Sequence, residues 1–576
     1  HLSPHVGGFV ISEQPLSKIV PIENTAMKNR QVIQWDKNDI NILGLLKVDI
    51  LALGMLSAIR RSLKLIEKKL CQIETNNYSF SIQDIPPDDQ STYSMISRAD
   101  TIGVFQIESR AQMSMLPRLK PKCFYDLVIE VAIVRPGPIK GGMIHPYLQR
   151  RNSQETIQYP TKEIENALSR TLGVPIFQEQ VMQLAILAAD FTPGEADQLR
   201  RSMAAWKKNS ELNSFYTRII SGMLAKGYSK KFAEETFLQI EGFGEYGFPE
   251  SHAASFASLV YASSWIKNYH PDVFLASLLN SQPLGFYATS QLIRDAKNHE
   301  VKILPVDIQN SSVETTLEFD SNPTLKINNL FPVRIGLNQI SKLPKETMFR
   351  IENGRKNGSY KSITDLANRA DLGKYELKIL ANSGALESLH KNRYEASWEA
   401  TGYQKFTGLL KQCHLMESEI KPNALPKPSE VELLLADYNN LGFSLTKHPL
   451  TYVRNLLGTK TIAEQKKSSE IKTIKTSGLI THRQKPSAAK GVIFLTIEDE
   501  TDTLNLIIPK YLSEKFEYII CNSKLITVIG RWQSGKSSSQ DLSGQRSSIT
   551  IDFLWDKSEI LLKIFCNFAW RSRDFH

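Results

Sequence analysis

The segment LGLLKVDILALGML, residues 43–56, is almost entirely apolar but contains two charged residues, Lys47 and Asp49. LLKVDI predicts a β-strand, in which alternate residues point to the same face. Lys47 and Asp49 then share the open face, and Val48 and Ile50 point to the opposite, half-buried side. An aspartate on such a strand is held rigidly enough to bind a metal ion, and the lysine beside it can neutralise a phosphate. A surface ion pair, or an aspartate that caps the next helix, explains the same pattern.

The composition narrows the class of protein. The 576 residues are 41% hydrophobic and 23% charged, which is typical of a globular chain with several domains. The net charge of +10 is compatible with nucleic-acid binding but is also found in proteins that bind none. Five widely spaced cysteines without a CxxC motif argue against a disulfide framework or zinc site and favour a cytoplasmic location. No apolar run could span a bilayer, and no signal peptide is visible.

Helical spacing dominates the middle of the chain. From Gly54 to Leu70, apolar residues recur every three or four positions, which predicts one amphipathic helix. Residues 76–100 are polar and predict a connection. Residues 101–285 predict a mostly helical region, and residues 333–400 predict shorter helices.

The C-terminal part, residues 470–556, has a different pattern. Five short runs are rich in Ile, Val, Leu and Thr, and a helix-compatible segment lies between the third and fourth runs. Five strands in this order are typical of an OB barrel. The Ser- and Gly-rich residues 534–547 predict a long loop between the last two strands. The five runs are IKTIKTSGLI, GVIFLTIED, TLNLIIP, KLITVIG and SITIDFLW.

Several motifs together resemble one family. QWDKNDINILGLLKVDILALGMLSAIRR (34–61) resembles the segment that carries the third catalytic carboxylate in bacterial C-family DNA polymerases, the family of the DNA polymerase III alpha subunit. The other motifs follow in the order and spacing of that family. They are GVFQIES (103–109), AIVRPGPI (132–139), FQEQVM (177–182), LRRSMAAWKK (199–208) and GFPESHAASFA (247–257).

The resemblance implies a role for the two charged residues of the opening segment. The palm of this family holds two magnesium ions with three aspartates, which implies that Asp49 is the third metal ligand and that Lys47 faces the nucleotide phosphates. The motif that carries the other two aspartates is absent from this sequence. The chain also begins with His1 rather than methionine. We therefore expect a fragment whose PHP domain, thumb and first half of the palm precede it.

The resemblance also implies phosphate-binding residues in the fingers. Arg135, held by the following proline, is placed near the phosphates of the incoming nucleotide. Arg200 and Lys207 lie seven residues apart and share a helical face, as do Arg201 and Lys208, so these four cations are candidates for DNA binding. An ordinary turn arginine and a solvated charged face explain the same residues.

Further candidate DNA contacts lie nearer the C-terminus. Tyr246 and His252 belong to a Gly- and aromatic-rich segment that could cover a base pair, although His252 also suits a simple helix start. Lys490 and Phe494 of the barrel are candidates for binding single-stranded DNA, but OB barrels bind proteins as well. In the helix-hairpin-helix region, residues 341–344 read SKLP, without the glycines that the family usually has there.

These patterns and the resemblance predict a multi-domain α+β chain. The ending WRSRDFH and Trp35 resemble the error-prone branch of the family. The predicted parts are the C-terminal part of the palm (1–75), mostly helical fingers (76–285), a mixed region with the helix-hairpin-helix (286–400), a connector (401–465), a five-stranded OB barrel (466–560) and a tail (561–576).

The resemblance implies a DNA-directed DNA polymerase that acts in translesion synthesis and damage-induced mutagenesis, with Mg²⁺ as cofactor. The implied partners are primer-template DNA, deoxynucleoside triphosphates and other damage-tolerance proteins. A sliding clamp could bind QKFTGLL (404–410), which also fits a helix core. We expect the chain to be inactive alone, because it carries one of the three carboxylates. The alternatives are a non-catalytic remnant that binds primer-template or single-stranded DNA and, with no clustered acids to support it, a two-metal nuclease.

Overall fold

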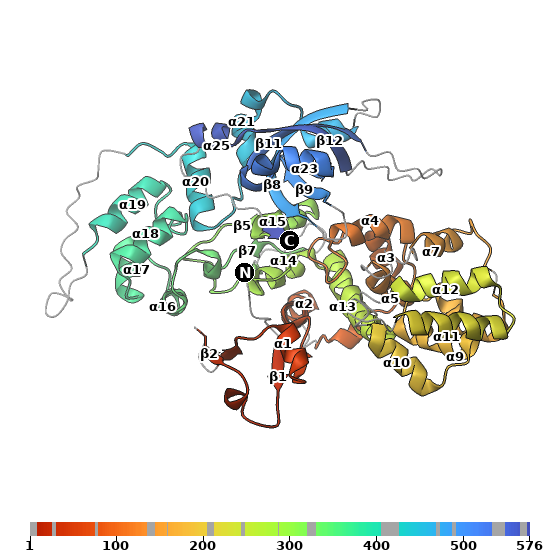
Figure 1. Ribbon diagram of the computed structural model, residues 1–576. Coiled ribbons are helices and arrows are strands. Elements are labelled where there is room, and N and C mark those ends of the chain that lie inside the picture. Colours follow the sequence, from red (N-terminus) through yellow and green to blue (C-terminus); the bar gives the residue numbers. More distant parts are fainter. Residues whose placement is uncertain are drawn as a thin grey trace.

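The computed structural model describes most of the chain. Figure 1 shows an N-terminal piece, a large helical lobe, a group of shorter helices and a C-terminal barrel. Within this part of the chain, no helix combines the length and the apolar character that a membrane span requires. The described residues are 8–25, 30–74, 79–134, 144–157, 159–203, 212–242, 248–285, 287–319, 330–404, 425–467, 473–485, 491–532, 548–564 and 573–575.

Two small antiparallel sheets form the N-terminal piece. β1 pairs with β4, and β2 pairs with β3. The strand predicted around Lys47 is therefore confirmed as β4. The elements of this piece are β1 (Gly8–Ile11), η1 (Leu16–Lys18), β2 (Ile22–Asn24), β3 (Gln31–Ile33), α1 (Lys37–Ile42) and β4 (Leu46–Asp49).

The apolar side of β4 differs from the sequence prediction. Val48 and Ile50, predicted to lie on a half-buried side, are 37% and 45% exposed. Phe9 and Ile11 on the neighbouring strand are also exposed. The prediction was wrong because it assumed a layer on this side of the strand, whereas β4 pairs with β1 alone and the described residues leave the face open to solvent.

The helix predicted from Gly54 is confirmed as α2 (Leu53–Glu74). Met55, Ile59 and Ile66 on its apolar side are buried. They join the core of the helical lobe, where α2 packs against α14. The N-terminal piece is therefore attached to the lobe through a continuous amphipathic helix.

α13 (Glu250–Tyr269) is the central helix of the lobe. It packs against α2, α3, α5 and α14, and most of its second half is buried. The mostly helical character predicted for residues 101–285 is confirmed. The other elements are η2 (Ile82–Asp84), α3 (Gln90–Ser97), α4 (Arg110–Leu119), α5 (Phe124–Ile133), α7 (Ile144–Arg151), α8 (Lys162–Leu168), η3 (Ser169–Thr171), α9 (Gln178–Ala189), α10 (Pro193–Met203), α11 (Leu212–Ala225), α12 (Lys230–Gly242), α14 (Pro271–Asn280) and α15 (Thr289–Asn298).

A small three-stranded sheet and a set of short helices follow the lobe. β7 lies in the centre of this sheet, parallel to β5 and antiparallel to β6. The elements are β5 (Ile303–Leu304), β6 (Thr316–Leu317), β7 (Val333–Arg334), η5 (Leu337–Gln339), α16 (Lys345–Arg355), α17 (Ile363–Arg369), α18 (Lys374–Asn382) and α19 (Arg393–Gly402).

The predicted OB barrel is confirmed. Its strands pair in the order β8-β9-β10-β12-β11, the β8–β11 pairing closes the barrel, and β10 runs parallel to β12. Helices α23 and α24 lie between the third and fourth strands, as predicted, whereas the predicted loop 534–547 lies outside the described residues. The elements are α20 (Glu430–Asn440), α21 (Pro449–Leu457), α22 (Ile462–Lys467), β8 (Thr473–Gln484), β9 (Ile493–Glu498), β10 (Thr503–Ile508), α23 (Lys510–Lys515), α24 (Glu517–Asn522), β11 (Leu525–Trp532), β12 (Ser548–Asp556), α25 (Ser558–Ile564) and β13 (Arg573–Phe575).

Glu130 of α5 is a buried acid without a hydrogen-bond partner. Its side chain is fully buried, and neither carboxyl oxygen accepts a hydrogen bond. Burial raises the pKa of Glu130 well above its ordinary value of 4.5, because a low-polarity environment disfavours the charged form. The folded protein therefore keeps a proton on Glu130 at pH values where the unfolded chain has released it.

Replacing Glu130 with methionine, which has a similar shape, should stabilise the protein. Because the folded state binds the proton more tightly, Glu130 lowers the free energy of unfolding progressively as the pH rises above about 4.5. We expect Glu130→Met to raise that free energy by about 1–3 kcal/mol at pH 8 and by less at pH 5, measured by urea unfolding. The control Glu235→Met, at an exposed position of α12, should change it by less than about 0.5 kcal/mol. An equal gain at both pH values would contradict the raised pKa.

Candidate functional site

β4, which carries Lys47 and Asp49, is followed closely by α2, the helix that packs into the lobe. The pleat of the strand places Lys47 and Asp49 on one face, and Gly8 stands opposite Asp49 in the register with β1. Gly8 has no side chain, so β1 places no side-chain atoms directly across from position 49. The structure describes the backbone of Asp49 but not its side chain. After β4 the chain turns at Ala52, which has a φ of 62°, and begins α2.

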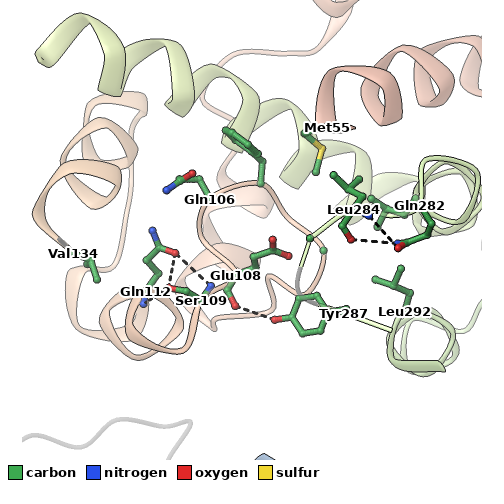
Figure 2. Close-up of a pocket in the computed structure, with 14 residues that line it drawn as sticks. Met55, Gln106, Glu108, Ser109, Gln112, Val134, Gln282, Leu284, Tyr287 and Leu292 are labelled. Carbon is green, nitrogen blue, oxygen red and sulfur yellow. Dashed lines mark hydrogen bonds between the residues drawn. The ribbon is translucent and has the colours of Figure 1, made fainter. Parts of the chain in front are cut away.

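A cavity of about 420 Å³ lies where α2 meets the lobe (Figure 2). This volume lies within the range of pockets that bind small ligands. One wall comes from the segment before α4 and the opposite wall comes from the end of α14 and the start of α15. The cavity is lined by Met55, Gly103, Phe105, Gln106, Glu108, Ser109, Gln112, Val134, Leu278, Gln282, Leu284, Gly285, Tyr287 and Leu292.

Hydrogen bonds fix the polar wall of the cavity. Ser109 caps α4, and its hydroxyl donates to Oε1 of Gln112 at 2.7 Å. The Tyr287 hydroxyl donates to the carbonyl oxygen of Glu108 at 2.9 Å (Figure 2). Burial raises the pKa of Tyr287, so this hydroxyl stays protonated and remains a donor. The cavity thus combines apolar walls with amide and carboxylate groups.

A partly buried ion cluster joins α13, α15 and the segment after α3. The Lys267 ammonium of α13 lies 3.0 Å from Asp100 Oδ1 and 2.9 Å from Asp295 Oδ2, and it donates to the Ile102 carbonyl at 3.1 Å. His299 Nε2 lies 2.7 Å from Asp100 Oδ2. Asp100, Asp295 and His299 are close enough together to hold a metal ion. The Lys267 ammonium already lies between the two carboxylates, so the cluster has its own fixed cation.

The pKa shifts of the cluster follow from these contacts. Burial acts to raise the pKa of Asp100. The hydrogen bond with His299 and the charge of Lys267 outweigh this effect, so the pKa of Asp100 lies below its ordinary value. Burial raises the pKa of Asp295 despite the nearby Lys267. The hydrogen bond with Asp100 raises the pKa of His299. The cluster is electrically neutral when His299 is protonated and both aspartates are ionised.

The OB barrel docks against the same part of the lobe. The Arg110 guanidinium, at the start of α4, donates to the Leu495 carbonyl at 2.8 Å and to Asn505 Oδ1 at 2.9 Å. It also donates to the Thr496 hydroxyl and lies over the Phe494 ring. Burial lowers the pKa of Arg110 to about 10, which still leaves it charged at neutral pH.

Two further contacts join the cavity wall to the barrel. The Tyr287 ring meets the His482 ring of β8 edge to face, with centroids 5.9 Å apart. Arg294 of α15 lies 3.7 Å from Glu498 at the end of β9. The barrel and the cavity therefore share structural elements.

Comparisons with known proteins agree over the whole chain. The bacterial DNA polymerase III alpha subunit finger domain matches residues 55–227, a helix-hairpin-helix motif matches residues 300–396, and the bacterial DNA polymerase III alpha NTPase domain matches residues 1–52. An error-prone DNA polymerase of Pseudomonas fluorescens is 48% identical over 580 residues, which cover 100% of this chain and 54% of the relative. The chain belongs to the bacterial DNA polymerase III alpha-subunit family.

Other relatives place the chain in the error-prone branch of this C family. The error-prone DNA polymerase of Burkholderia pseudomallei is 49% identical over 92% of this chain and 50% of the relative. That of Bordetella bronchiseptica is 49% identical over 93% of this chain and 50% of the relative. The chain thus spans about half the length of these relatives.

The candidate finger cations of this C-family chain are only partly described. Arg200 and Arg201 lie in the last turn of α10, where both pair with Asp197, at 2.9 and 2.7 Å. Their side chains are accessible, because Arg201 is 74% exposed and Arg200 is 39% exposed. Five other candidates of the fingers and the barrel lie outside the described residues. They are Arg135, Lys207, Lys208, Tyr246 and Lys490.

Two other candidates have partners inside the protein. The His252 ring lies between the rings of Phe248 and Phe256, with centroids 5.0 and 4.3 Å away. Phe494 is half-buried under the Arg110 guanidinium. An internal partner for each ring competes with stacking on a base, so DNA binding by His252 and Phe494 stays a prediction.

The two hairpins of the C-family helix-hairpin-helix region use their backbone groups internally. The Ser341 N–H donates to the Asn440 carbonyl at 2.7 Å, and Pro344 has no N–H. In the second hairpin, the Gly384 N–H donates to the Ala381 carbonyl at 3.1 Å. Gly384 has a φ of 79°, and a Cβ at this position would meet the guanidinium of Arg393. Residues 341–344, which lack the glycines of the family pattern, thus form a hairpin whose first N–H donates to a carbonyl of α20.

Sequence reasoning missed the cavity and the docking of the barrel. GVFQIES was recognised as a motif of the C family, but its residues were not predicted to form a ligand pocket with residues 278–292. Arg110 was not singled out, because its partners lie 385–395 positions away in the sequence. The only local signal was an arginine directly after a helix cap.

Arg110→Ala should loosen the barrel from the lobe. The substitution removes the three hydrogen bonds that the guanidinium donates to β9 and β10, so we expect the interface to lose about 2–4 kcal/mol. Hydrogen exchange should rise at residues 493–508 and 101–112. Arg110→Lys, which cannot form the forked contact, should show an intermediate rise. The control Arg531→Ala removes an exposed barrel arginine and should leave both segments protected; an equal rise in that variant would assign the effect to general destabilisation.

Proposed function

We propose that this chain forms part of an error-prone DNA-directed DNA polymerase, which extends a primer along a template and releases pyrophosphate. The observation that carries the proposal is the course of the chain from the charged face of β4 to the cavity. Asp49 stands at the end of the strand, and Met55, six residues later, lines the cavity wall. One short, continuous segment thus joins the strand that carries Asp49 to one of the residues that line the cavity.

The residues of β4 suit nucleotidyl transfer. A carboxylate at position 49 provides the hard oxygen ligand that Mg²⁺ prefers, and Gly8 opposite contributes no side-chain atoms. When bound, a pair of magnesium ions stabilises the attacking primer oxygen and the leaving pyrophosphate. Lys47 on the same face offsets negative charge on the triphosphate. Arg135 would add bidentate hydrogen bonds to the same phosphates.

The remaining parts of the chain would hold DNA. We assign the palm, fingers, mixed region, connector, barrel and tail to residues 1–75, 76–285, 286–400, 401–465, 466–560 and 561–576. In this scheme Arg200, Arg201, Lys207 and Lys208 contact the nucleic-acid backbone, and the barrel receives single-stranded template near Lys490. The relatives' name supports error-prone DNA synthesis. Translesion synthesis, a sliding clamp and other damage-tolerance partners are further parts of the proposal that rest on the family resemblance.

Primer extension tests the proposal directly. The chain is mixed with the part of the Pseudomonas fluorescens relative that it does not cover, together with primer-template, deoxynucleotides and Mg²⁺. We expect extension only in the mixture, because this chain supplies one of three metal carboxylates. Asp49→Ala should lower extension at least 100-fold, on the order of the loss when a group that stabilises the transition state is removed.

Asp39→Ala is the matched control, because Asp39 is an exposed acid in the same piece of the chain. It should retain full extension. Extension by this chain alone would overturn the account of the missing ligands. If no mixture extends the primer but the chain binds primer-template in a salt-dependent way, a non-catalytic DNA-binding protein becomes the better description.

A further inference from the structure

α2 carries five cations that serve two different purposes. Two of them pair inside the protein: Arg61 Nη1 lies 2.6 Å from Glu314 Oε2, and Lys69 Nζ lies 2.9 Å from Asp272 Oδ2. The Lys69–Asp272 pair is almost completely buried, and it attaches α2 to α14. These two ion pairs add to the buried apolar residues of α2, which join the core of the lobe.

The other three cations, Arg60, Lys64 and Lys68, face solvent. They follow one another at intervals of four residues, so they form a row along one face of the helix. All three are exposed, and none has an acidic partner within the described part of the chain. The row continues into Leu56 on one side and Gln72 on the other, and Glu67, three residues after Lys64, forms no ion pair with it within the described residues.

This row is unusual for an exposed helix of the same protein. On α12, the exposed Lys230 and Lys231 lie four residues before Glu234 and Glu235, and each lysine pairs with its glutamate. Such pairs stabilise a helix, whereas like charges four residues apart destabilise it. The row on α2 therefore lowers the stability of the free protein, and a bound anion would offset that cost.

We propose that the face of α2 formed by Arg60, Lys64 and Lys68 binds the phosphate backbone of duplex primer-template DNA. Successive cations are about 6 Å apart along the helix, so the row is about 12 Å long. Duplex DNA carries one negative charge per about 1.7 Å of its axis, so a row of this length faces several phosphates.

The position of the row on α2 determines how far from Asp49 the DNA backbone would bind. Arg60 lies about 10 Å along the helix from Leu53, the first residue after the turn that follows β4, and Lys68 lies about 22 Å from it. The contact therefore begins a few base pairs away from the strand that carries Asp49. This inference rests on the proposed function and adds a binding surface outside the fingers and the barrel.

The test is the salt dependence of primer-template binding by the full chain. Fluorescence anisotropy of a labelled primer-template duplex is measured between 50 and 200 mM salt. The variant Arg60→Gln/Lys64→Gln/Lys68→Gln should bind with a log–log salt slope that is smaller by about 2.7, because each lost phosphate contact removes about 0.9. Across this range the unmodified chain should lose about 40-fold more affinity than the variant, which is that slope difference applied to a fourfold change in salt.

The matched control is Lys226→Gln/Lys230→Gln/Lys231→Gln, which removes the same charge from exposed lysines that are paired with acids. It should keep the slope of the unmodified chain. If the salt slopes of both triple variants fall by the same amount, the inference is overturned, because the effect is then one of net charge. If the triple variant of α2 does not fold, Lys64→Gln alone should reduce the slope by about 0.9, and an unchanged slope would overturn the inference.

The proposed function fails in a different way from this inference. If the unmodified chain does not bind primer-template at any salt concentration, both are overturned. If it binds and the α2 variant binds with an unchanged slope, the proposed function stands and the α2 surface is excluded.

Discussion

The buried ammonium of Lys267 constrains the middle of the molecule. A charge in the interior is costly unless it is paired and hydrogen-bonded, and Lys267 meets that requirement only with Asp100, Asp295 and the Ile102 carbonyl together. These partners come from the segment after α3 and from α15, which are far apart in the sequence. Ile102 directly precedes the wall of the cavity, and Leu292 of the opposite wall lies one turn before Asp295. The ion cluster therefore fixes both walls of the cavity at once.

The walls that the cluster fixes also hold the barrel. Arg110 follows the capped start of α4, Tyr287 belongs to the cavity lining, and Arg294 lies next to Asp295 on α15. The cavity walls and the β9–β10 side of the barrel are therefore joined by direct contacts. This docking also places the Arg110 guanidinium over Phe494, a candidate ring for stacking on a base.

The sequence predicted those features whose cause is local. The helix α2 follows from a period of three to four residues, and the barrel strands follow from short β-branched runs with a helix in the expected place. The cavity was not predictable in this way, because its walls come from residues around 106 and 284. The exposure of Val48 was missed for a related reason, since alternation shows which residues share a face but not what covers that face. The role implied for Asp49 came from resemblance to a family, and no periodicity could have supplied it.

The exposed apolar side of β4 affects the charged side as well. A sheet of two short strands is only marginally stable in water without a layer against it. Phe9, Val48 and Ile50 are open to solvent, so the position of Asp49 depends on what packs against them. Any segment that covered this apolar face would hold β4 in place, and with it Lys47 and Asp49. In a polymerase whose other two carboxylates come from a further part of the palm, the same packing that stabilises the strand would bring the three ligands together. Completion of the fold and completion of the metal site would then be one event.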